Sequence, residues 1–381
     1  MQGKGASAPV LAFAWPDMIR FKHAFTDPVP QSVEKSFADA GITTVHGRAR
    51  FVDRTTLRVG DETLSGHHVV IATGARHASL RIPGEEHLTT STGFLELGEL
   101  PRRVVFVGGG YIAFEFSHVA ARAGAQAHVL ERGARPLERF DPDLVQTTRD
   151  LGIDVQLNTT VTAIEKRGDE LLVHARTGDQ TQTWVAALVI HAAGRVPEID
   201  DLDLETAGVA RETAGVSVNA YLQSVTNPAV YAAGDAVASG SLPSTPVAGL
   251  QGGIVASNLL HGNTRTPDYR GVPSVVFTTP PLARVGLDED AARDQGLPYT
   301  MHHAETGGWY SSRRVALPHT GFKVLVEDAT DLILGAHLLG LAAEEIINIF
   351  GLAIRTGLRA TDLKDMVYAY PTSASDISAM V

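Results

Sequence analysis

Four apolar residues in a row, Val104–Val107, open the most regular pattern in the chain. Strands buried on both faces need no alternation of polar and apolar residues, so this run predicts a parallel strand inside a sheet. Apolar residues then recur at helical spacing on one face of the next segment: Ile112, Phe116, Val119 and Ala120. Gly124 marks the end of that helix, and a second apolar run follows at 128–130. The order is strand, glycine turn, helix, strand.

The patterns on either side predict further elements. Residues 1 to about 40 read as irregular and then helical over Val33–Ala40, because three prolines precede that amphipathic stretch. From Ile42 to Ile71 short strands alternate with glycine turns and end in the apolar 69–71. We predict a helix from Asp141 and a helix from Thr245 to Leu260. Further strands are predicted around these ranges: 153–155, 161–164, 171–175, 188–190 and 230–232.

The last third of the chain has a pattern of its own. Residues 267–273 begin and end with proline and predict a linker. Beyond them the strands are predicted at 274–277, 322–326 and 332–339. The helices are predicted at 287–295, 343–357 and 361–366. This mixture predicts an α+β block, and no glycine-rich nucleotide motif lies within it.

The residues of the central glycine turn suit a dinucleotide. Gly108 permits the tight turn, Gly110 lets a pyrophosphate approach the backbone, and Ala113 lets the helix pack closely on the strand. The amino end of the helix offers free N–H groups to phosphates. Glu131, at the end of the second apolar run, stands where an acid binds a ribose 2′-hydroxyl. A glycine triplet alone is equally typical of an ordinary turn, but strand, helix and acid in register favour a dinucleotide.

The acid favours NAD(H) over NADP(H) as the dinucleotide. Arg132 keeps the alternative open, because a guanidinium beside the acid can accept a 2′-phosphate.

Composition excludes some classes of function. The chain has 381 residues, 44% hydrophobic and 20% charged, which is ordinary for a globular protein of two or three domains. A net charge of −11 argues against nucleic-acid or anionic-membrane partners, because these select clustered lysine and arginine. The most apolar stretch, 332–354, contains Glu344 and Glu345, so we expect no membrane span. The amino terminus has no signal-peptide pattern, and we expect a cytoplasmic protein.

The chain contains no cysteine, which excludes disulfides, thiolate catalysis and thiolate metal sites within it. The paired histidines 67–68 and 302–303 lack metal-ligand spacing, so we predict no metal site.

Five motifs in order carry a resemblance to a known family. They are Ala72-Thr73-Gly74, the stretch from Gly108 to Glu115, Ala193-Gly194-Arg195, Ala233-Gly234-Asp235 and Tyr370-Pro371-Thr372. Together they resemble the pyridine nucleotide-disulfide oxidoreductases, whose familiar members are glutathione reductase, mercuric reductase and dihydrolipoyl dehydrogenase. The resemblance implies an α/β fold with two Rossmann-like nucleotide-binding domains, the FAD domain incomplete, plus a C-terminal α+β dimerisation domain. It implies an FAD-binding remnant at 1–100 and 196–266, an NAD(P)-binding domain at 101–195 and a homodimer built by 267–381.

The same resemblance implies the site residues. The flavin would be held by Asp235 at its ribityl chain, by Thr245, Pro246, Val247 and Ala248 at the ring edge, and by Ala49, Thr73 and Gly74 through backbone contacts. The NAD site would consist of Gly108, Gly110, Tyr111, Ile112, Glu131, Arg132 and Gly194. The catalytic candidates are Tyr111, which covers the nicotinamide pocket, Glu115 in the same motif, and Tyr370. Asp235 is equally compatible with a plain helix N-cap.

Two departures separate the chain from its relatives. The family opens with its own glycine-rich unit for the FAD pyrophosphate and a helix bearing two redox cysteines, and this chain starts downstream of both. Residues 1–5 resemble an internal stretch of a longer relative, so we expect a truncated reading frame or a fragment. We therefore expect 69–71 and 230–232 to be left with unpaired edges, and residues 1–100 to be the least protected.

The second departure lies at the carboxyl end. The relatives carry His-Pro-Thr-x-x-Glu there, and this chain has Tyr370 in the place of the histidine. Because tyrosine is a poor general base at neutral pH, the substitution points away from disulfide reduction.

Three functions stay open at this point. The first is a flavoprotein that passes hydride from NAD(P)H to FAD and on to an unknown small-molecule acceptor. The second is a catalytically silent module that binds NAD and dimerises. The third is a metal-ion reductase, which the absence of soft cysteine ligands disfavours. Dimerisation itself has an alternative, since the apolar helix 346–354 is equally compatible with an intramolecular core helix.

Overall fold

The computed structural model describes residues 13–149 and 152–381, so the first part of the predicted irregular start lies outside the described residues. The chain divides into two compact units. Unit 1 comprises 1–19, 79–193 and 270–381, and unit 2 comprises 20–78 and 194–269. Each unit is made of segments far apart in the sequence.

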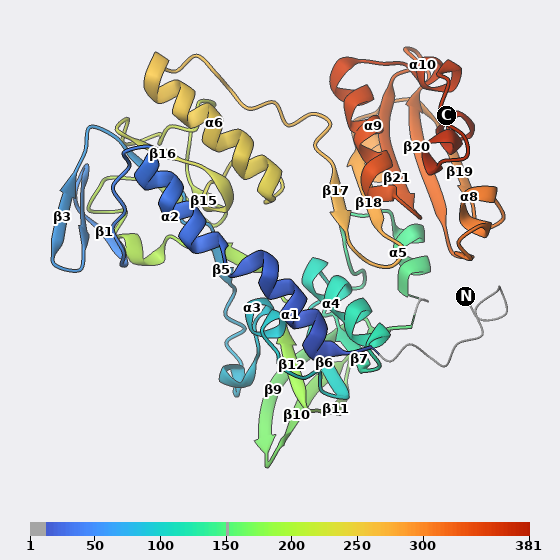
Figure 1. Ribbon diagram of the computed structural model, residues 1–381, viewed down its shortest axis with the longest axis horizontal. Helices are drawn as coiled ribbons and strands as arrows, with labels where there is room; N and C mark the ends of the chain where they lie inside the picture. The colour runs from blue at the N-terminus through green and yellow to red at the C-terminus, as the bar shows by residue number, and fades with distance from the viewer. Residues whose placement is uncertain (1–12, 150–151) are drawn as a thin grey trace. The chain divides into compact units, whose positions relative to one another are not determined.

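A four-stranded parallel sheet forms the centre of the first part of unit 1 (Figure 1). Its strand order is β12 (Leu188–His191), β6 (Arg103–Val107), β7 (Gln126–Leu130) and β8 (Asp154–Gln156). The predicted interior strand is β6, and its residues 104–107 are all buried. Two helices lie against the sheet, α3 (Ser91–Leu95) and α4 (Tyr111–Arg122), whereas α5 (Pro142–Arg149) contacts the antiparallel sheet described below.

An antiparallel meander lies between β8 and β12 in the sequence. It contains β9 (Thr159–Arg167), β10 (Glu170–Thr177) and β11 (Gln180–Ala186). A short 3₁₀ turn, η1 (Glu85–His87), lies against β9. Gly84 explains that close approach, because an added Cβ would lie 1.7 Å from the carbonyl oxygen of Ile164.

The second part of unit 1 is a five-stranded antiparallel sheet with helices (Figure 1). The strand order is β17 (Ser274–Val276), β18 (Leu282–Gly286), β21 (Ile333–Leu339), β20 (Gly321–Glu327) and β19 (Tyr299–Glu305). The helices are α7 (Glu289–Asp294), α8 (Tyr310–Arg313), α9 (Ala343–Thr356), α10 (Ala360–Asp365) and the 3₁₀ segment η4 (Ser373–Ala379).

Helix α9 settles part of the question about the apolar segment 346–354. Ile346, Ile347, Phe350 and Ala353 are buried, and the helix packs on β18 and β21. Leu352, on the other side of the helix, is 56% exposed. The buried face of α9 therefore belongs to the core of its own chain.

One hydrophobic cluster joins the two parts of unit 1. Val276, Leu282 and Leu339 of the antiparallel sheet pack in the same buried cluster as Phe106 and Phe114 of the parallel sheet and α4. The boundary between these parts is therefore a continuous core.

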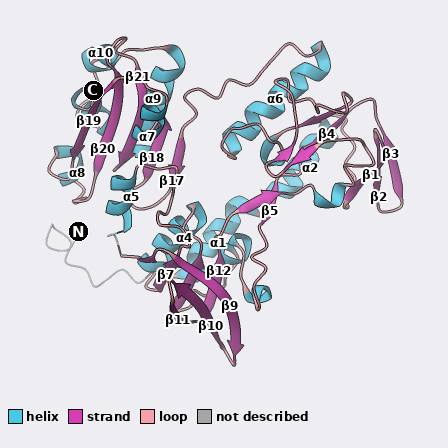
Figure 2. Cartoon of the chain, turned by 180° about the vertical axis from the view of Figure 1, so that it is seen from behind, coloured by secondary structure: helices cyan, strands magenta, loops and turns pink. Residues whose placement is uncertain are grey.

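Unit 2 holds small sheets and two helices (Figure 2). Three strands form a meander: β1 (Ala49–Asp53), β2 (Thr56–Val59) and β3 (Glu62–Ser65). The other pairs are parallel β4 (Val69–Ile71) with β16 (Val230–Ala232), antiparallel β5 (Ala75–His77) with β13 (Arg195–Pro197), and antiparallel β14 (Arg211–Glu212) with β15 (Gly215–Val216). The helical segments are α2 (Val29–Asp39), α6 (Thr245–His261), η2 (Asp200–Leu202) and η3 (Gly234–Ala236).

The structure corrects the prediction for the first forty residues. Helix α1 (Trp15–Thr26) occupies much of the stretch expected to be irregular, and α2 begins at Val29 rather than Val33. Proline is tolerated in the first turn of a helix, so Pro16 and Pro30 mark helix starts rather than breaks. The pattern also missed β11, β18 and β19.

The expectation of unpaired strand edges is wrong for one strand. β4 and β16 pair with each other, and the far edge of β16 bonds to residues 222–224: Ser224 N–H donates to the Val230 carbonyl at 2.8 Å, and Ala232 N–H donates to Leu222 at 3.0 Å. Within the described residues β4 pairs with β16 alone, and Val70 is 42% exposed. One free edge therefore remains, on β4.

Candidate functional site

The glycine turn between β6 and α4 has the geometry of a phosphate cradle. Gly108 has a φ of +104°, and a Cβ there would lie 2.4 Å from the Ala192 carbonyl oxygen, so only glycine fits. Gly110 precedes α4 as its N-cap and has no atom closer than 3.9 Å to an added Cβ. No side chain caps the first turn of α4. Its amino end is therefore open to an anion.

Glu131, the first residue after β7, is fixed against this turn. Its carboxylate accepts hydrogen bonds from the N–H groups of Gly109 and Gly133, each at 2.5 Å. A Cβ at Gly109 would lie 2.9 Å from the same carboxylate, which explains the middle glycine. The structure thus brings together Gly108, Gly110 and Glu131 as the sequence predicted. Ile112 lies one residue into α4, and the Arg132 side chain is exposed.

Tyr111, the first residue of α4, lies between the nucleotide turn and β17. Its ring meets Phe140 edge-on, with centroids 5.5 Å apart. Burial raises the pKa of the Tyr111 hydroxyl, while a hydrogen bond with Ser274 and the charges of two nearby arginines, Arg284 and Arg139, oppose the shift. The tyrosine is still 38% exposed. It therefore has one side held by the protein and the other accessible.

Glu115 lies one helical turn farther along α4. Its carboxylate accepts a hydrogen bond from the Phe277 N–H at 3.0 Å. Burial raises the pKa of Glu115, and that single N–H opposes the shift. Phe277 has its own side chain 61% exposed.

Residues at helical spacing along one face of α4 attach it to the segment 274–279. Besides Tyr111 and Glu115, Arg122 donates to the Thr279 carbonyl at 2.6 Å, and His118 Nδ1 lies 3.5 Å from the Thr279 N–H. His118 is 1% exposed, and desolvation together with the Arg122 charge lowers its pKa to about 4. The polar residues on this face are therefore structural attachments as well as site candidates.

The flavin candidates gather at one end of the β4–β16 pair in unit 2. Ala72-Thr73-Gly74 follows β4, and Ala233-Gly234-Asp235 follows β16. Carboxyl ends of neighbouring parallel strands are the usual place for a ligand in such sheets. Gly234 has a φ of +72°, and its N–H donates to Gln251 of α6 at 2.7 Å.

The start of α6 lies at the same end. An added Cβ on Gly234 would lie 3.4 Å from the Ala248 side chain. Thr245 and Pro246 are exposed, whereas Val247 is buried. The Ser244 hydroxyl, at the N-cap, is buried without a hydrogen-bond partner in the described chain. Ala49 lies in a different sheet, at the start of β1 opposite Val59.

Asp235 makes an ion pair with Arg195 of the Ala-Gly-Arg motif, at 3.7 Å. Arg195 also donates to the Ala75 carbonyl at the start of β5. The adjacent Gly194 has a φ of +102°, and its carbonyl accepts from the Ala78 N–H at 3.2 Å. Two of the five sequence motifs are thus connected by a direct contact.

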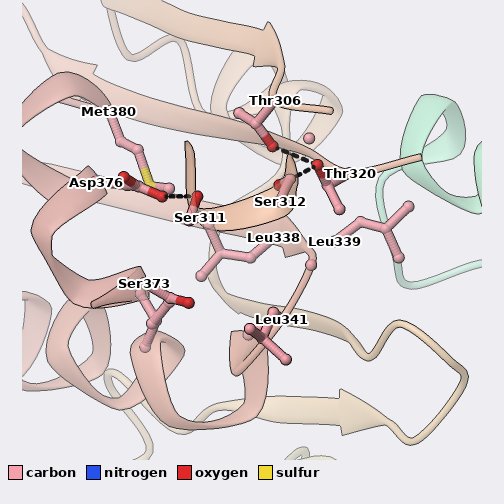
Figure 3. A pocket seen from close by; sticks show the side chains of 14 residues that line it. Thr306, Ser311, Ser312, Thr320, Leu338, Leu339, Leu341, Ser373, Asp376 and Met380 are labelled. Atoms are coloured by element: carbon pink, nitrogen blue, oxygen red, sulfur yellow. Dashed lines mark hydrogen bonds between the residues drawn. The ribbon is translucent and has the colours of Figure 1, made fainter. Parts of the chain in front are cut away.

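Tyr370 lies in the antiparallel part of unit 1. It is 78% exposed and stacks on Tyr310 with centroids 6.3 Å apart. The acidic residue that follows, Asp376, is turned away into a small pocket, where it accepts a hydrogen bond from Ser311 (Figure 3). Burial raises the pKa of Asp376, and the Ser311 bond opposes this shift. Among the described residues no carboxylate holds the tyrosine, unlike the histidine that the resemblance would place there.

The same pocket contains a chain of hydroxyls. Thr306 donates to Thr320 at 2.8 Å, and Ser312 and Thr320 share a bond of 2.9 Å (Figure 3). These groups satisfy one another beside Leu338 and Met380.

Sequence patterns did not single out Gly133, Phe140, Ser274 or the backbone of Phe277. Of these, only Gly133 could have been recognised from the sequence, because it is a glycine two residues after Glu131. In the described part of the chain no three acidic or histidine side chains converge as metal ligands do. None of the described helices is both long enough and apolar enough to cross a membrane.

Comparison with known families gives two matches. Residues 6–252 match the model for pyridine nucleotide-disulphide oxidoreductases, and residues 272–381 match the model for the dimerisation domain of that family.

Individual relatives agree with these matches. Mercuric reductase from Staphylococcus aureus is 32% identical over 356 residues, covering 88% of this chain and 62% of the relative. The chloroplastic/mitochondrial glutathione reductase of Pisum sativum is 32% identical over 374 residues, covering 96% of this chain and 66% of that reductase. The chain thus spans less than two thirds of the length of both reductases. An uncharacterized 19.7 kDa protein in the mercuric resistance operon of Staphylococcus aureus is 46% identical over 180 residues, 47% of this chain and all of that protein.

The fold agrees as well. The Cu(II) complex of the HOCl-induced flavoprotein disulfide reductase RclA from Escherichia coli superposes with a TM-score of 0.88 at 29% identity, over 97% of this chain and 85% of that one. The expected α/β fold with a C-terminal dimerisation domain is confirmed. The matches to both family models show that this chain belongs to the pyridine nucleotide-disulphide oxidoreductase family.

Proposed function

We propose that this chain is an NADH-dependent flavoprotein oxidoreductase that passes electrons to a small-molecule acceptor of unknown identity. The observation that carries the proposal is the open glycine turn with the Glu131 carboxylate fixed beside it. When bound, the two cofactors would supply hydride-transfer chemistry, and the residues of this chain would hold and orient them. Family membership supports both cofactors, and the residues described above fit them.

NAD(H) is the preferred dinucleotide in this proposal. The Glu131 carboxylate is held by two N–H groups at the end of β7, where a ribose would meet it. A 2′-phosphate there would face a fixed negative charge, and Arg132 is exposed and unconstrained by any carboxylate in the described chain. We therefore assign ribose binding to Glu131, and phosphate binding to the backbone of Gly108, Gly110 and Ile112. The resemblance adds Gly194 as a further backbone contact to the same ligand.

We assign flavin binding to the residues that follow the carboxyl ends of β4 and β16. Asp235 would accept hydrogen bonds from the ribityl chain, and the Thr73-Gly74 backbone would border the same ligand. The start of α6, from Thr245 to Ala248, would meet the ring edge. The unpartnered Ser244 hydroxyl supports a ligand at this position, because a buried polar group without a partner is costly. Ala49 fits least well, since it lies in a separate sheet.

Three residues take the chemical roles in this proposal. Tyr111 would cover the nicotinamide and exclude water from it. Glu115 holds a proton more readily than an exposed glutamate and orients the segment at Phe277. Tyr370 would face the acceptor as an exposed phenol. The printed chain supplies no thiol for any of these steps.

A homodimer is part of the proposal, supported by the match of 272–381 to the family's dimerisation domain. Multi-angle light scattering measures it directly, and a monomer at micromolar concentration contradicts it.

The second candidate function is a catalytically silent module that binds NAD and dimerises. The exposed, unsupported Tyr370 and the absence of cysteine favour it, because the family's usual proton and thiol chemistry lacks its residues here.

One experiment separates the two. The purified chain is incubated with FAD, passed through a gel-filtration column, and its visible spectrum is recorded before and after NADH is added without oxygen. Retained flavin that is bleached by NADH supports the oxidoreductase. Binding of NADH without retained flavin supports the catalytically silent module. If neither ligand binds, both candidate functions are wrong.

A further inference from the structure

Arg284 of β18 lies at the junction between the antiparallel sheet and the nucleotide turn. Its Cα is paired across the sheet with Ser274 of β17, and β17 packs against α4, which begins at Tyr111. The Arg284 guanidinium donates to the carbonyl of Arg139, and also to the Gly286 carbonyl at 2.6 Å. Arg284 is thus attached to the loop that follows β7.

That loop carries the second arginine, Arg139. The next residue, Phe140, packs on the Tyr111 ring. Two residues before Arg139, the Leu137 N–H donates to the Gly109 carbonyl at 3.0 Å. The loop therefore contacts both the glycine turn and Tyr111, and its Arg139 side chain is exposed. Burial raises the pKa of the Tyr111 hydroxyl, and the charges of Arg284 and Arg139 both act on that hydroxyl to lower its pKa.

The charge of this pair is incompletely neutralised. In the described chain neither guanidinium makes an ion pair with a carboxylate, and the two hydrogen bonds of Arg284 go to neutral carbonyl oxygens. Desolvation lowers the pKa of Arg284, the charge of Asp288 opposes this shift, and the like charge of Arg139 adds a smaller lowering effect. Partly buried cations are stabilised by an opposite charge, so this position favours an anion.

We infer that Arg284 and Arg139 form a phosphate subsite for the dinucleotide, so that the dimerisation domain contributes directly to nucleotide binding. The inference rests on the proposed function. A guanidinium holds phosphate oxygens through paired N–H groups, which adds directional bonds to those of the glycine turn. Glu131 then selects the ribose on one side of the turn, and the arginines hold the phosphates on the other.

The test measures binding of NADH, ADP-ribose and adenosine to the full chain and to Arg284→Met and Arg139→Met, by calorimetry. Each variant is expected to bind NADH and ADP-ribose about tenfold more weakly, since each loses a charge-assisted hydrogen bond, and adenosine unchanged. Arg293→Met is the matched control, because Arg293 lies on α7 with its side chain 64% exposed and makes an ion pair with Asp290. It is expected to bind all three ligands like the parent chain.

Two outcomes overturn the inference in different ways. If the parent chain binds NADH and both arginine variants bind it equally well, the subsite is wrong while the proposed function stands. If the parent chain binds neither NADH nor ADP-ribose, both fail together. Should Arg284→Met lose its fold by circular dichroism, Arg139→Met decides alone, because only the backbone of Arg139 is used in structural bonds.

Discussion

Lys323 Nζ lies 3.0 Å from Asp141 Oδ2, and this contact joins β20 to the residue that precedes α5. Asp141 also accepts the N–H groups of Asp143 and Leu144, each at 3.1 Å, and so caps the helix. Lys323 further reaches Asp143 and Glu289, each at 2.7 Å. Burial disfavours the ammonium, but these carboxylates outweigh it and raise the pKa of Lys323.

We predict that Lys323→Met destabilises the protein by about 3–5 kcal/mol, because it leaves the 2% exposed Asp141 carboxylate without its cation. Urea denaturation followed by circular dichroism measures this. Asp143→Asn is the control: its side chain is 75% exposed, and we expect a loss of about 1 kcal/mol or less. Equal losses for the two variants would show that the buried carboxylate is not the cause.

Glu131 is expected to set dinucleotide preference. Glu131→Arg should weaken NADH binding by about 10-fold or more, through the loss of charge-assisted bonds, and improve binding of NADPH. Fluorescence titration with both nucleotides gives the ratio. Glu99→Gln, at an exposed glutamate, controls for the loss of one surface charge. An unchanged ratio in Glu131→Arg would remove the basis for assigning NAD(H).

Because His118 is buried, we predict that the free energy of unfolding decreases as the pH falls. Its folded pKa of about 4 lies below the ordinary 6.5, so between these values the unfolded chain takes up a proton that the folded chain does not. Stability is therefore full above pH 6.5 and falls as the pH drops towards 4, by about 2 kcal/mol between pH 7 and 5. Denaturant titrations at both pH values should show a smaller fall in His118→Gln. The exposed His319→Gln should behave like the parent, and a parent-like fall in His118→Gln contradicts the assignment.

Asp235→Ala is expected to lower FAD affinity by about tenfold with little loss of stability. The ion pair with Arg195 is long, and its side chains are 22% and 49% exposed, so it contributes about 1 kcal/mol or less to folding. Flavin fluorescence measures affinity, and thermal denaturation measures stability. Asp201→Asn, at an exposed acid in the same unit, is the control. A large stability loss with unchanged flavin affinity would instead support a structural cap.

The free edge of β4 gives a prediction for hydrogen exchange. The Val69 N–H donates to Ala229 at 2.9 Å, so the alternate residue Val70 directs its amide to the unpaired side. We expect Val70 to exchange far faster than Val105 of β6, which lies between two strands. Protection of Val70 equal to that of Val105 would show that another segment covers this edge.

Local patterns were sufficient for the nucleotide turn, because strand, turn, helix and acid are contiguous over about thirty residues. The same holds for α9, which the apolar spacing on its buried face and the terminal Gly357 indicate. The partners of α4 were not predictable in this way. About 160 residues separate Glu115 from Phe277, and a similar number separates Tyr111 from Ser274. No periodicity in the sequence indicates which backbone N–H a buried glutamate will bind.

The prediction for α1 was wrong because proline, which ends many helices, lies here in the first turn of a helix, at Pro16. The strand β18 escaped notice because it is short and buried residues lie on both of its faces, so it shows no alternation. The strand β19 contains few strongly apolar residues, with His302 and His303 at its centre.

The buried cluster shared by Phe106, Phe114, Val276 and Leu282 has a consequence for how the protein melts. A boundary made of core rather than of linker cannot open without exposing both sides to water, so the parallel sheet and the dimerisation domain should denature in a single cooperative step. A nucleotide bound beside the parallel sheet would therefore raise the melting temperature of the dimerisation domain as well.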